Sequence, residues 1–158
     1  MIRQRLGKDL LFFDGGMGTL LQEKGLAPGE LPETWNLTHS EEIYKIHRQY
    51  IEAGSDIILT NTFGANALKF HDDSCSLEEI IKAAVSHVKK AEREELLQTG
   101  DERKIYTALD VGPTGKLLKP MGDLEFETAY EAFKEVVILG EQAGADLIHI
   151  ETMSDTYE

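Results

Sequence analysis

The chain has 158 residues, of which 41% are hydrophobic and 28% are charged, so it can bury the core of one ordinary globular domain. Its formal net charge of −13 argues against nucleic acid or an anionic membrane as a partner, because both bind basic surfaces. A single cysteine, Cys75, excludes an internal disulfide and favours a reducing cytoplasm, and no apolar run is long enough to predict a signal peptide or a membrane span.

Four apolar runs predict the strands of a parallel sheet, since strands buried on both faces read as unbroken apolar segments. In chain order the runs are Leu10–Phe13, Asp56–Thr60, Lys104–Asp110 and Asp146–Glu151. A long polar loop follows the first run, and apolar residues at helical spacing then predict helices over Glu41–Ala53, residues 77–97 and Phe126–Ala143. The alternation of strands and helices predicts an α/β fold.

The ends of these helices carry capping residues. We expect Ser40 and Ser76 to be N-caps and Gly54 to follow the end of the first helix, and the terminal SDTYE reads as the start of a fourth helix.

Two segments also resemble each other, AGSDIILTNT (Ala53–Thr62) and AGADLIHIET (Ala143–Thr152). The similarity is either an internal repeat or the use of the same turn residues in two helix-to-strand units. Both explanations predict repeated βα units with right-handed crossovers.

The stretch LLFFDGGMGTLL, residues 10–21, places an acid and three glycines directly after a strand. A dinucleotide site needs Gly-x-Gly-x-x-Gly, but Leu21 stands where the third glycine belongs, and no P-loop lysine follows. Asp14 would also repel a phosphate. One carboxylate beside unhindered backbone N–H groups suits a zwitterion such as an α-amino acid, and the alternative is a tight turn capped by Asp14.

The other strand ends are polar as well. They carry Thr60-Asn61-Thr62, then Asp110 before the loop Val111-Gly112-Pro113-Thr114-Gly115, then Glu151-Thr152. Ligands of barrels and open parallel sheets bind at the carboxyl ends of the strands, so these residues are candidates for one site. Asp14 and Glu151 could together hold one ammonium group, or one of them could be a general acid with a raised pKa.

Four segments resemble the homocysteine-binding domain of cobalamin-dependent methionine synthases, in the homocysteine S-methyltransferase family. They are LFFDGGMGTLLQ, HRQYIEAGSDIILTNTFGAN, ALDVGPTGKLLKPMGDLEFE and IHIETMSD, in the family's order and over nearly the whole chain. The resemblance implies that residues 1–158 are the first four βα units of a (β/α)8 TIM barrel, the N-terminal half of a homocysteine-binding domain. It also implies a methyltransferase of methionine biosynthesis.

The resemblance also assigns roles to individual residues. Asp14 and Glu151 match the acids that hold the ammonium group of homocysteine, and the backbone around Gly15, Gly16 and Met17 lies at the amino-acid end of the substrate. The motif Thr60, Asn61 and Thr62 lies beside the substrate, and Asp110 completes the set of expected substrate-binding residues.

The cofactors that the resemblance implies depend on residues outside this chain. Family members hold zinc with three cysteine thiolates from the second half of the barrel, and zinc deprotonates the homocysteine thiol that attacks the methyl donor. Cobalamin and methyltetrahydrofolate bind other modules. We therefore expect no metal ligands and no catalytic residue in this chain, inactivity when it is alone, and a partner for the open half-barrel, either the second half or another copy.

Other candidate ligands are weak. His71 and Cys75 are four residues apart, which is at most a two-ligand metal site, and His39, His47 and His87 suit solvated or packed positions. His149 shares a strand face with Glu151 and either lines the site or packs in the interior.

Two other readings of the chain remain open. The first is a non-catalytic amino-acid-binding or assembly module of half-barrel type. The second is an unrelated flavodoxin-like sheet of four strands.

Overall fold

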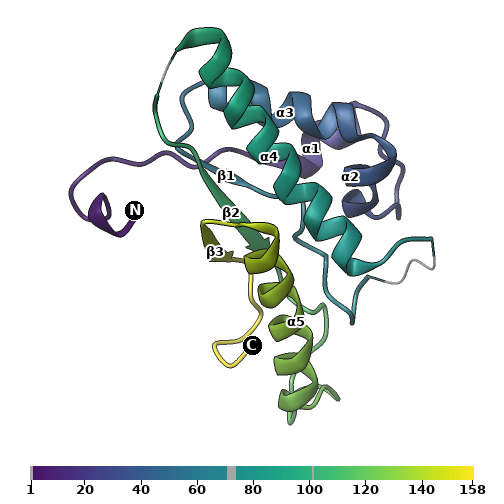
Figure 1. Cartoon of the computed structure of the whole chain (residues 1–158). Coiled ribbons are helices and arrows are strands. Elements are labelled where there is room, and N and C mark those ends of the chain that lie inside the picture. The colour runs from purple at the N-terminus through teal and green to yellow at the C-terminus, as the bar shows by residue number, and fades with distance from the viewer. Residues whose placement is uncertain (1, 71–73, 101) are drawn as a thin grey trace.

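The computed structural model describes residues 2–70, 74–100 and 102–158. A three-stranded parallel sheet runs in the order β1 (Ile57–Leu59), β2 (Tyr106–Val111) and β3 (Leu147–Ile150). The long helices α3 (Ser40–Glu52), α4 (Leu77–Thr99) and α5 (Phe126–Ala143) pack side by side in that order (Figure 1). Shorter helical segments precede them: η1 (Ile2–Gln4), α1 (Met17–Glu23), η2 (Pro32–Thr34) and α2 (Trp35–Thr38).

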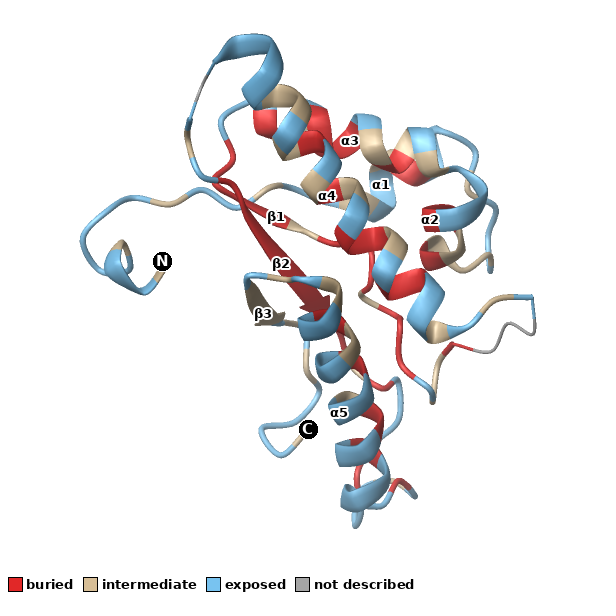
Figure 2. Ribbon diagram, viewed as in Figure 1, coloured by how far each residue is buried: buried red, intermediate tan, exposed pale blue. Residues whose placement is uncertain are grey.

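The two faces of the sheet pack against different elements, because successive side chains of a strand point to opposite sides. Ile58 and Leu109 are fully buried and face α3, α4 and α5. Ile57 and Ala108 point the other way and form a smaller apolar cluster with Leu147. Burial decreases across the sheet, from the buried β2 to the partly exposed β3 at its edge (Figure 2).

The segment Leu10–Phe13 does not form the predicted strand. It runs beside β1 with a single parallel bridge, between Phe13 and Ile57. Its backbone pairing is short: the N–H groups of Asp56 and Ile57 donate to the carbonyl of Phe12, and the N–H of Asp14 donates to the carbonyl of Ile57. Leu10 and Phe12 are also 76% and 55% exposed. The described residues therefore contain three strands of the four that we predicted.

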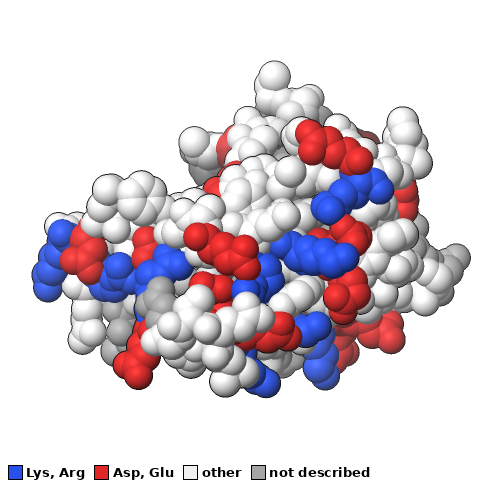
Figure 3. Space-filling model, turned by 90° about the horizontal axis from the view of Figure 1, so that it is seen from above, with Lys and Arg blue, Asp and Glu red and all other residues white. Residues whose placement is uncertain are grey.

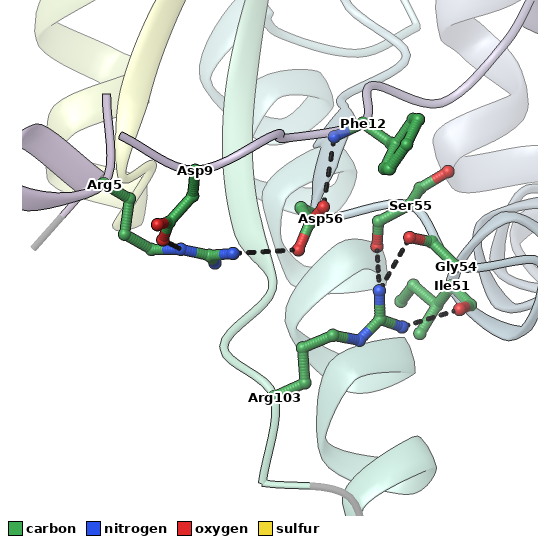
Figure 4. A network of polar contacts seen from close by, with 8 residues as sticks. All are labelled: Arg5, Asp9, Phe12, Ile51, Gly54, Ser55, Asp56 and Arg103. Atoms are coloured by element: carbon green, nitrogen blue, oxygen red, sulfur yellow. Dashed lines mark hydrogen bonds and ion pairs between the residues drawn. The ribbon is translucent and has the colours of Figure 1, made fainter. Parts of the chain in front are cut away.

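An aspartate anchors the start of β1 and of β3 in the same way. The N–H of Asp56 donates to the carbonyl of Phe12 at 2.8 Å, and its carboxylate accepts the N–H of the same residue (Figure 4). Asp146 makes the equivalent pair with Thr107 of β2, at 2.8 and 2.9 Å. The two similar sequence segments thus share the same pair of hydrogen bonds at the turn into the strand. Phe12 has the position beside β1 that Thr107 has beside β3.

Arg103 closes the carboxyl end of α3 (Figure 4). Its guanidinium donates to the carbonyls of Ile51, Gly54 and Ser55 at 2.8 to 3.0 Å. Ile51 lies in the last turn of α3, and Gly54 and Ser55 follow the helix, so this side chain joins the end of α3 to the turn before β1. Gly54 has φ +106° and directly follows the C-cap, which confirms its predicted position.

The predicted ends of the other helices are confirmed in part. Ser76 forms a complete capping box with Glu79 at the start of α4. Ser40 is not an N-cap: α3 begins at Ser40 itself, directly after α2, and the cap position is His39. The terminal segment forms turns instead of a helix: the carboxylate of Asp155 accepts the N–H of Tyr157, and the carboxylate of Glu158 accepts the N–H of Ser154.

The predicted long loop after residue 13 contains helical structure that we did not expect. Segments α1, η2 and α2 lie there, held by Leu21 and Trp35, which are 0% and 3% exposed. Both side chains pack with Ile43 and Ile46 of α3. This cluster fixes the loop against α3 and so places the glycine stretch that precedes it.

Basic side chains on the surface lie next to acidic ones. On the face in Figure 3, lysine and arginine side chains lie among acidic ones. Glu42, for example, pairs with Lys24 at 2.6 Å and Lys45 at 2.9 Å. None of the helices in the described part of the chain is long and apolar enough to cross a membrane.

Removing the α4 cap tests this account of helix formation. We expect Ser76→Ala to lower the free energy of unfolding by about 1 kcal/mol, because one backbone donor loses its acceptor and the capping box is broken. Denaturant titration measures the change. Ser86→Ala is the matched control: Ser86 is exposed within α4, where alanine should stabilise by a few tenths of a kcal/mol. Equal effects of both changes would contradict the assigned cap.

Candidate functional site

The ends of β1, β2 and β3 and the loop after Phe13 surround one cavity of about 540 Å³. That volume lies in the usual range for a small-molecule site, roughly 300–1,000 Å³. Its lining includes eight of the nine sequence-predicted residues: Asp14, Gly15, Gly16, Met17, Thr60, Asn61, Asp110 and Glu151. Thr152, named among the polar strand ends, also lines it, together with residues that we did not predict: Gly18, Pro32, Glu33, Leu59 and Phe63.

Thr62, the ninth predicted residue, lies behind the cavity. Its hydroxyl donates to the carbonyl of Asp110 at 2.7 Å, and the hydroxyl of Thr60 accepts the N–H of Asp110 at 3.2 Å. The two hydroxyls also lie 2.7 Å apart. This threonine pair therefore fixes the backbone of Asp110 between β1 and β2.

Asp14 is held by β1. Its N–H donates to the carbonyl of Ile57 at 3.0 Å, and its Oδ2 accepts the N–H of Leu59 at 3.1 Å. The other oxygen, Oδ1, is buried and has no hydrogen-bond partner among the described residues. Burial raises the pKa of Asp14 to about 7, and the nearby charge of Glu151 adds to the rise. This carboxylate is poised to accept a proton or to meet a cation.

Asp110 is in a similar environment. It is 6% exposed, and its Oδ1 also has no hydrogen-bond partner in the described part of the chain. Burial raises its pKa to about 7, with contributions from the charges of Glu151, Asp14 and Glu33. The negative charges of these neighbours thus add to burial in disfavouring the ionised form of Asp110.

Glu33 is the acidic residue of the site that the sequence did not reveal. It lies in η2 and is 3% exposed, with Oε1 accepting the N–H of Gly64 at 2.6 Å. Its Oε2 is buried without a hydrogen-bond partner among the described residues. Pro32 at the start of a helical turn is a visible sequence pattern, but burial of Glu33 depends on a loop 31 residues away.

Tyr50 of α3 packs against the loop that contains Gly15 and Gly16. Its hydroxyl donates to the carbonyl of Gly16 at 3.3 Å. A Cβ at Gly15 would lie 2.8 Å from the same hydroxyl oxygen, so a side chain at Gly15 would displace the ring. No atom lies within 4 Å of the Cβ positions of Gly16 and Gly18, so the backbone there is open to a ligand.

One cluster of described residues offers ligand atoms for a metal. Atoms of Asp110, His149 and Glu151 all lie within 4.8 Å of one another, and Nε2 of His149 is 3.7 Å from Oε2 of Glu151. The three-thiolate zinc site implied by the resemblance does not fit this chain: Cys75 is its only cysteine and packs against an apolar cluster. His71, considered as a partner of Cys75, lies outside the described residues.

The remaining histidines have packed or structural environments. His39 stacks on Trp35, and Nε2 of His87 lies 2.7 Å from the carbonyl oxygen of Asn36. His47 is fully buried, which lowers its pKa to about 3. The three side chains thus occupy packed or hydrogen-bonded positions, as the sequence predicted.

Comparison with known proteins identifies the relatives of this fold. Residues 11–158 match the family model described as homocysteine S-methyltransferase. Crystal structures of the homocysteine methyltransferase MmuM from Escherichia coli superpose on the chain with TM-scores of 0.82 (oxidized form), 0.83 (metallated form) and 0.73 (apo form). Their sequence identities are 23%, 22% and 25%. The matches cover 96–99% of this chain but only 52–58% of those proteins.

The raised pKa of Asp14 makes stability depend on pH. Between the ordinary value of 3.8 and about 7, the folded chain binds more protons than the unfolded chain, so the free energy of unfolding falls as pH rises through this range. Asparagine carries no charge, so we expect Asp14→Asn to melt at a higher temperature than the wild type at about pH 8, with the difference shrinking near about pH 4.

Thermal unfolding at the two pH values measures this effect. Asp123→Asn is the control, since Asp123 is exposed and should change the melting temperature little at either pH. A shift for Asp14→Asn that is the same at both pH values would contradict the buried, proton-binding carboxyl.

Proposed function

The chain belongs to the homocysteine S-methyltransferase family, and on that basis we propose that it binds homocysteine in the cavity at the strand ends. The observation that carries the proposal is the set of unpartnered buried carboxylate oxygens around this cavity, on Asp14, Glu33 and Asp110. Such oxygens are unfavourable in an empty site and favourable beside a cation that donates hydrogen bonds. The α-ammonium group of an amino acid is such a cation.

Asp14 and Glu151 are the proposed partners of the ammonium group. Asp14 is fixed by the backbone of β1, so its free oxygen has a defined position. Glu151 follows β3, and its N–H donates to the carbonyl of Val111 at 3.2 Å. A bound ammonium would stabilise the ionised form of Asp14 and so lower its raised pKa.

The carboxylate of homocysteine would then lie against the glycine loop. Backbone N–H groups around Gly15, Gly16 and Met17 are the proposed donors, because no side chain covers Gly16 or Gly18. With both charged groups held in this way, the thiol extends away from the grip. The amino-acid end is thereby separated from the sulfur that reacts.

Methyl transfer belongs to the proposal as the role of the complete barrel. Zinc held by cysteine thiolates would supply the chemistry of thiol activation, and this chain's residues would bind and orient the substrate. The proposed methyl donor is methyltetrahydrofolate acting through cobalamin on other modules. On this proposal residues 1–158 alone do not turn over, because the thiolates are not among them.

A partner for the sheet edge is also part of the proposal. Ile150 of β3 is 65% exposed, and Phe13, beside β1, is 43% exposed. An exposed edge strand with apolar side chains favours pairing with another strand. We expect residues 1–158 to self-associate or to bind a complementary half-barrel, and sedimentation velocity measures this. A stable monomer at all concentrations tested, without binding of a hydrophobic dye, would contradict it.

Calorimetry with homocysteine tests the binding site directly. We expect binding that does not require zinc, because the proposed grip contains no metal. At about pH 8, Asp14→Asn should weaken it by about 1.5 to 3 kcal/mol, since a charged hydrogen-bond partner is lost. Asp123→Asn is the control and should bind as the wild type does. An unchanged affinity in Asp14→Asn would remove Asp14 from the site, and no binding by the wild type would refute the proposed function.

A further inference from the structure

The hydrogen bond between Gly64 and the side chain of Glu33 does not require a charged acceptor. Oε1 of Glu33 accepts the N–H of Gly64 at 2.6 Å, and a neutral glutamine could accept that bond equally well. Its Oε2 has no hydrogen-bond partner in the described part of the chain, although the side chain is 97% buried. A buried carboxylate with a free oxygen costs stability, so a purely structural role does not explain it.

We infer that Glu33 is a specificity-determining residue of the cavity, which selects ligands that carry a protonated amino group. The inference rests on the proposed function, because it takes an amino acid as the ligand. It adds a third acid, from a different element, to the two acids that the family resemblance assigns to the ammonium group.

The surroundings hold Glu33 in place before any ligand arrives. Asn61 donates from its side chain to the carbonyl of Pro32 at 2.8 Å, and Asn36 donates to the carbonyl of Asn61 at 2.8 Å. The turn that carries Glu33 is thus joined to the loop after β1 by side-chain bonds on both sides. A carboxylate fixed in this way loses little conformational freedom when it meets a ligand.

The lining of the cavity is acidic, which favours a positively charged ligand. Among the described residues that line the cavity, four are acids and none is lysine, arginine or histidine. The charge of Glu33 is also one of those that raise the pKa of Asp110, so it acts within the cavity. A ligand without a positive charge would bring no counter-charge to this acidic lining, whereas an ammonium group would.

Comparing the affinities for two ligands distinguishes recognition of the amino group from binding of the rest of the molecule. Homocysteine and 4-mercaptobutanoate share the thiol, the carboxylate and the chain length, but only homocysteine has the amino group. We expect the wild type to prefer homocysteine, and Glu33→Gln to reduce that preference by roughly 10- to 100-fold. The loss should fall on homocysteine, with the affinity for 4-mercaptobutanoate unchanged or higher.

A second variant moves the carboxylate without removing it. A Cβ at Gly64 would lie 2.7 Å from Oε1 of Glu33, so Gly64→Ala must displace that side chain. It should lower the preference for homocysteine in the same direction as Glu33→Gln. Glu127→Gln is the matched control, since Glu127 is exposed on α5 and should leave both affinities unchanged. Circular dichroism verifies that each variant is folded.

Each outcome of the titrations has a separate meaning. If the wild type binds homocysteine and Glu33→Gln keeps the same preference, the inference is overturned while the proposed function stands. Equal weakening of both ligands by Glu33→Gln would assign Glu33 to support of the loop and also overturn it. If the wild type binds neither ligand, the proposed function itself fails.

Discussion

Two aspartates, Asp56 and Asp146, determine how the strands meet, and the rest of the molecule depends on that alignment. Each one exchanges two hydrogen bonds with a single residue of the neighbouring segment, Phe12 or Thr107. A shift of register would break both bonds of a pair and move side chains to the wrong face. The carboxyl ends of the strands therefore lie at one level, and acids far apart in the sequence meet around one cavity.

The same alignment creates an electrostatic cost at the opposite ends of the strands. Asp14 and Asp110 keep carboxyl oxygens out of water without giving each a hydrogen bond, and the pKa of both rises to about 7. Residues selected only for stability would not be arranged in this way. Part of the stability gained by packing the apolar helices is thus offset at a site whose buried carboxyl groups are relieved by a proton or by a cation.

Periodicity and capping rules predicted what depends on local chemistry. They placed α5 at its observed bounds, the cap of α4 at Ser76 and polar residues at the strand ends, and the family resemblance singled out Asp14 and Glu151. They missed what depends on contacts between distant segments. Glu33 is buried by a loop 31 residues away, and residues 10–13 pair with β1 through a single bridge, with Leu10 and Phe12 exposed. Neither fact is visible in a short stretch of sequence.

The close packing around the glycines also limits how this site can change by mutation. Gly15 and Gly64 have no left-handed backbone, so their conformations alone would accept alanine. Each is instead restricted by volume, because the space of its missing side chain is filled by Tyr50 or by Glu33. Such positions favour paired changes, because a larger residue fits without displacing its neighbour once that neighbour has become smaller. The lineage of this protein should therefore change Gly15 with Tyr50, and Gly64 with Glu33, as pairs.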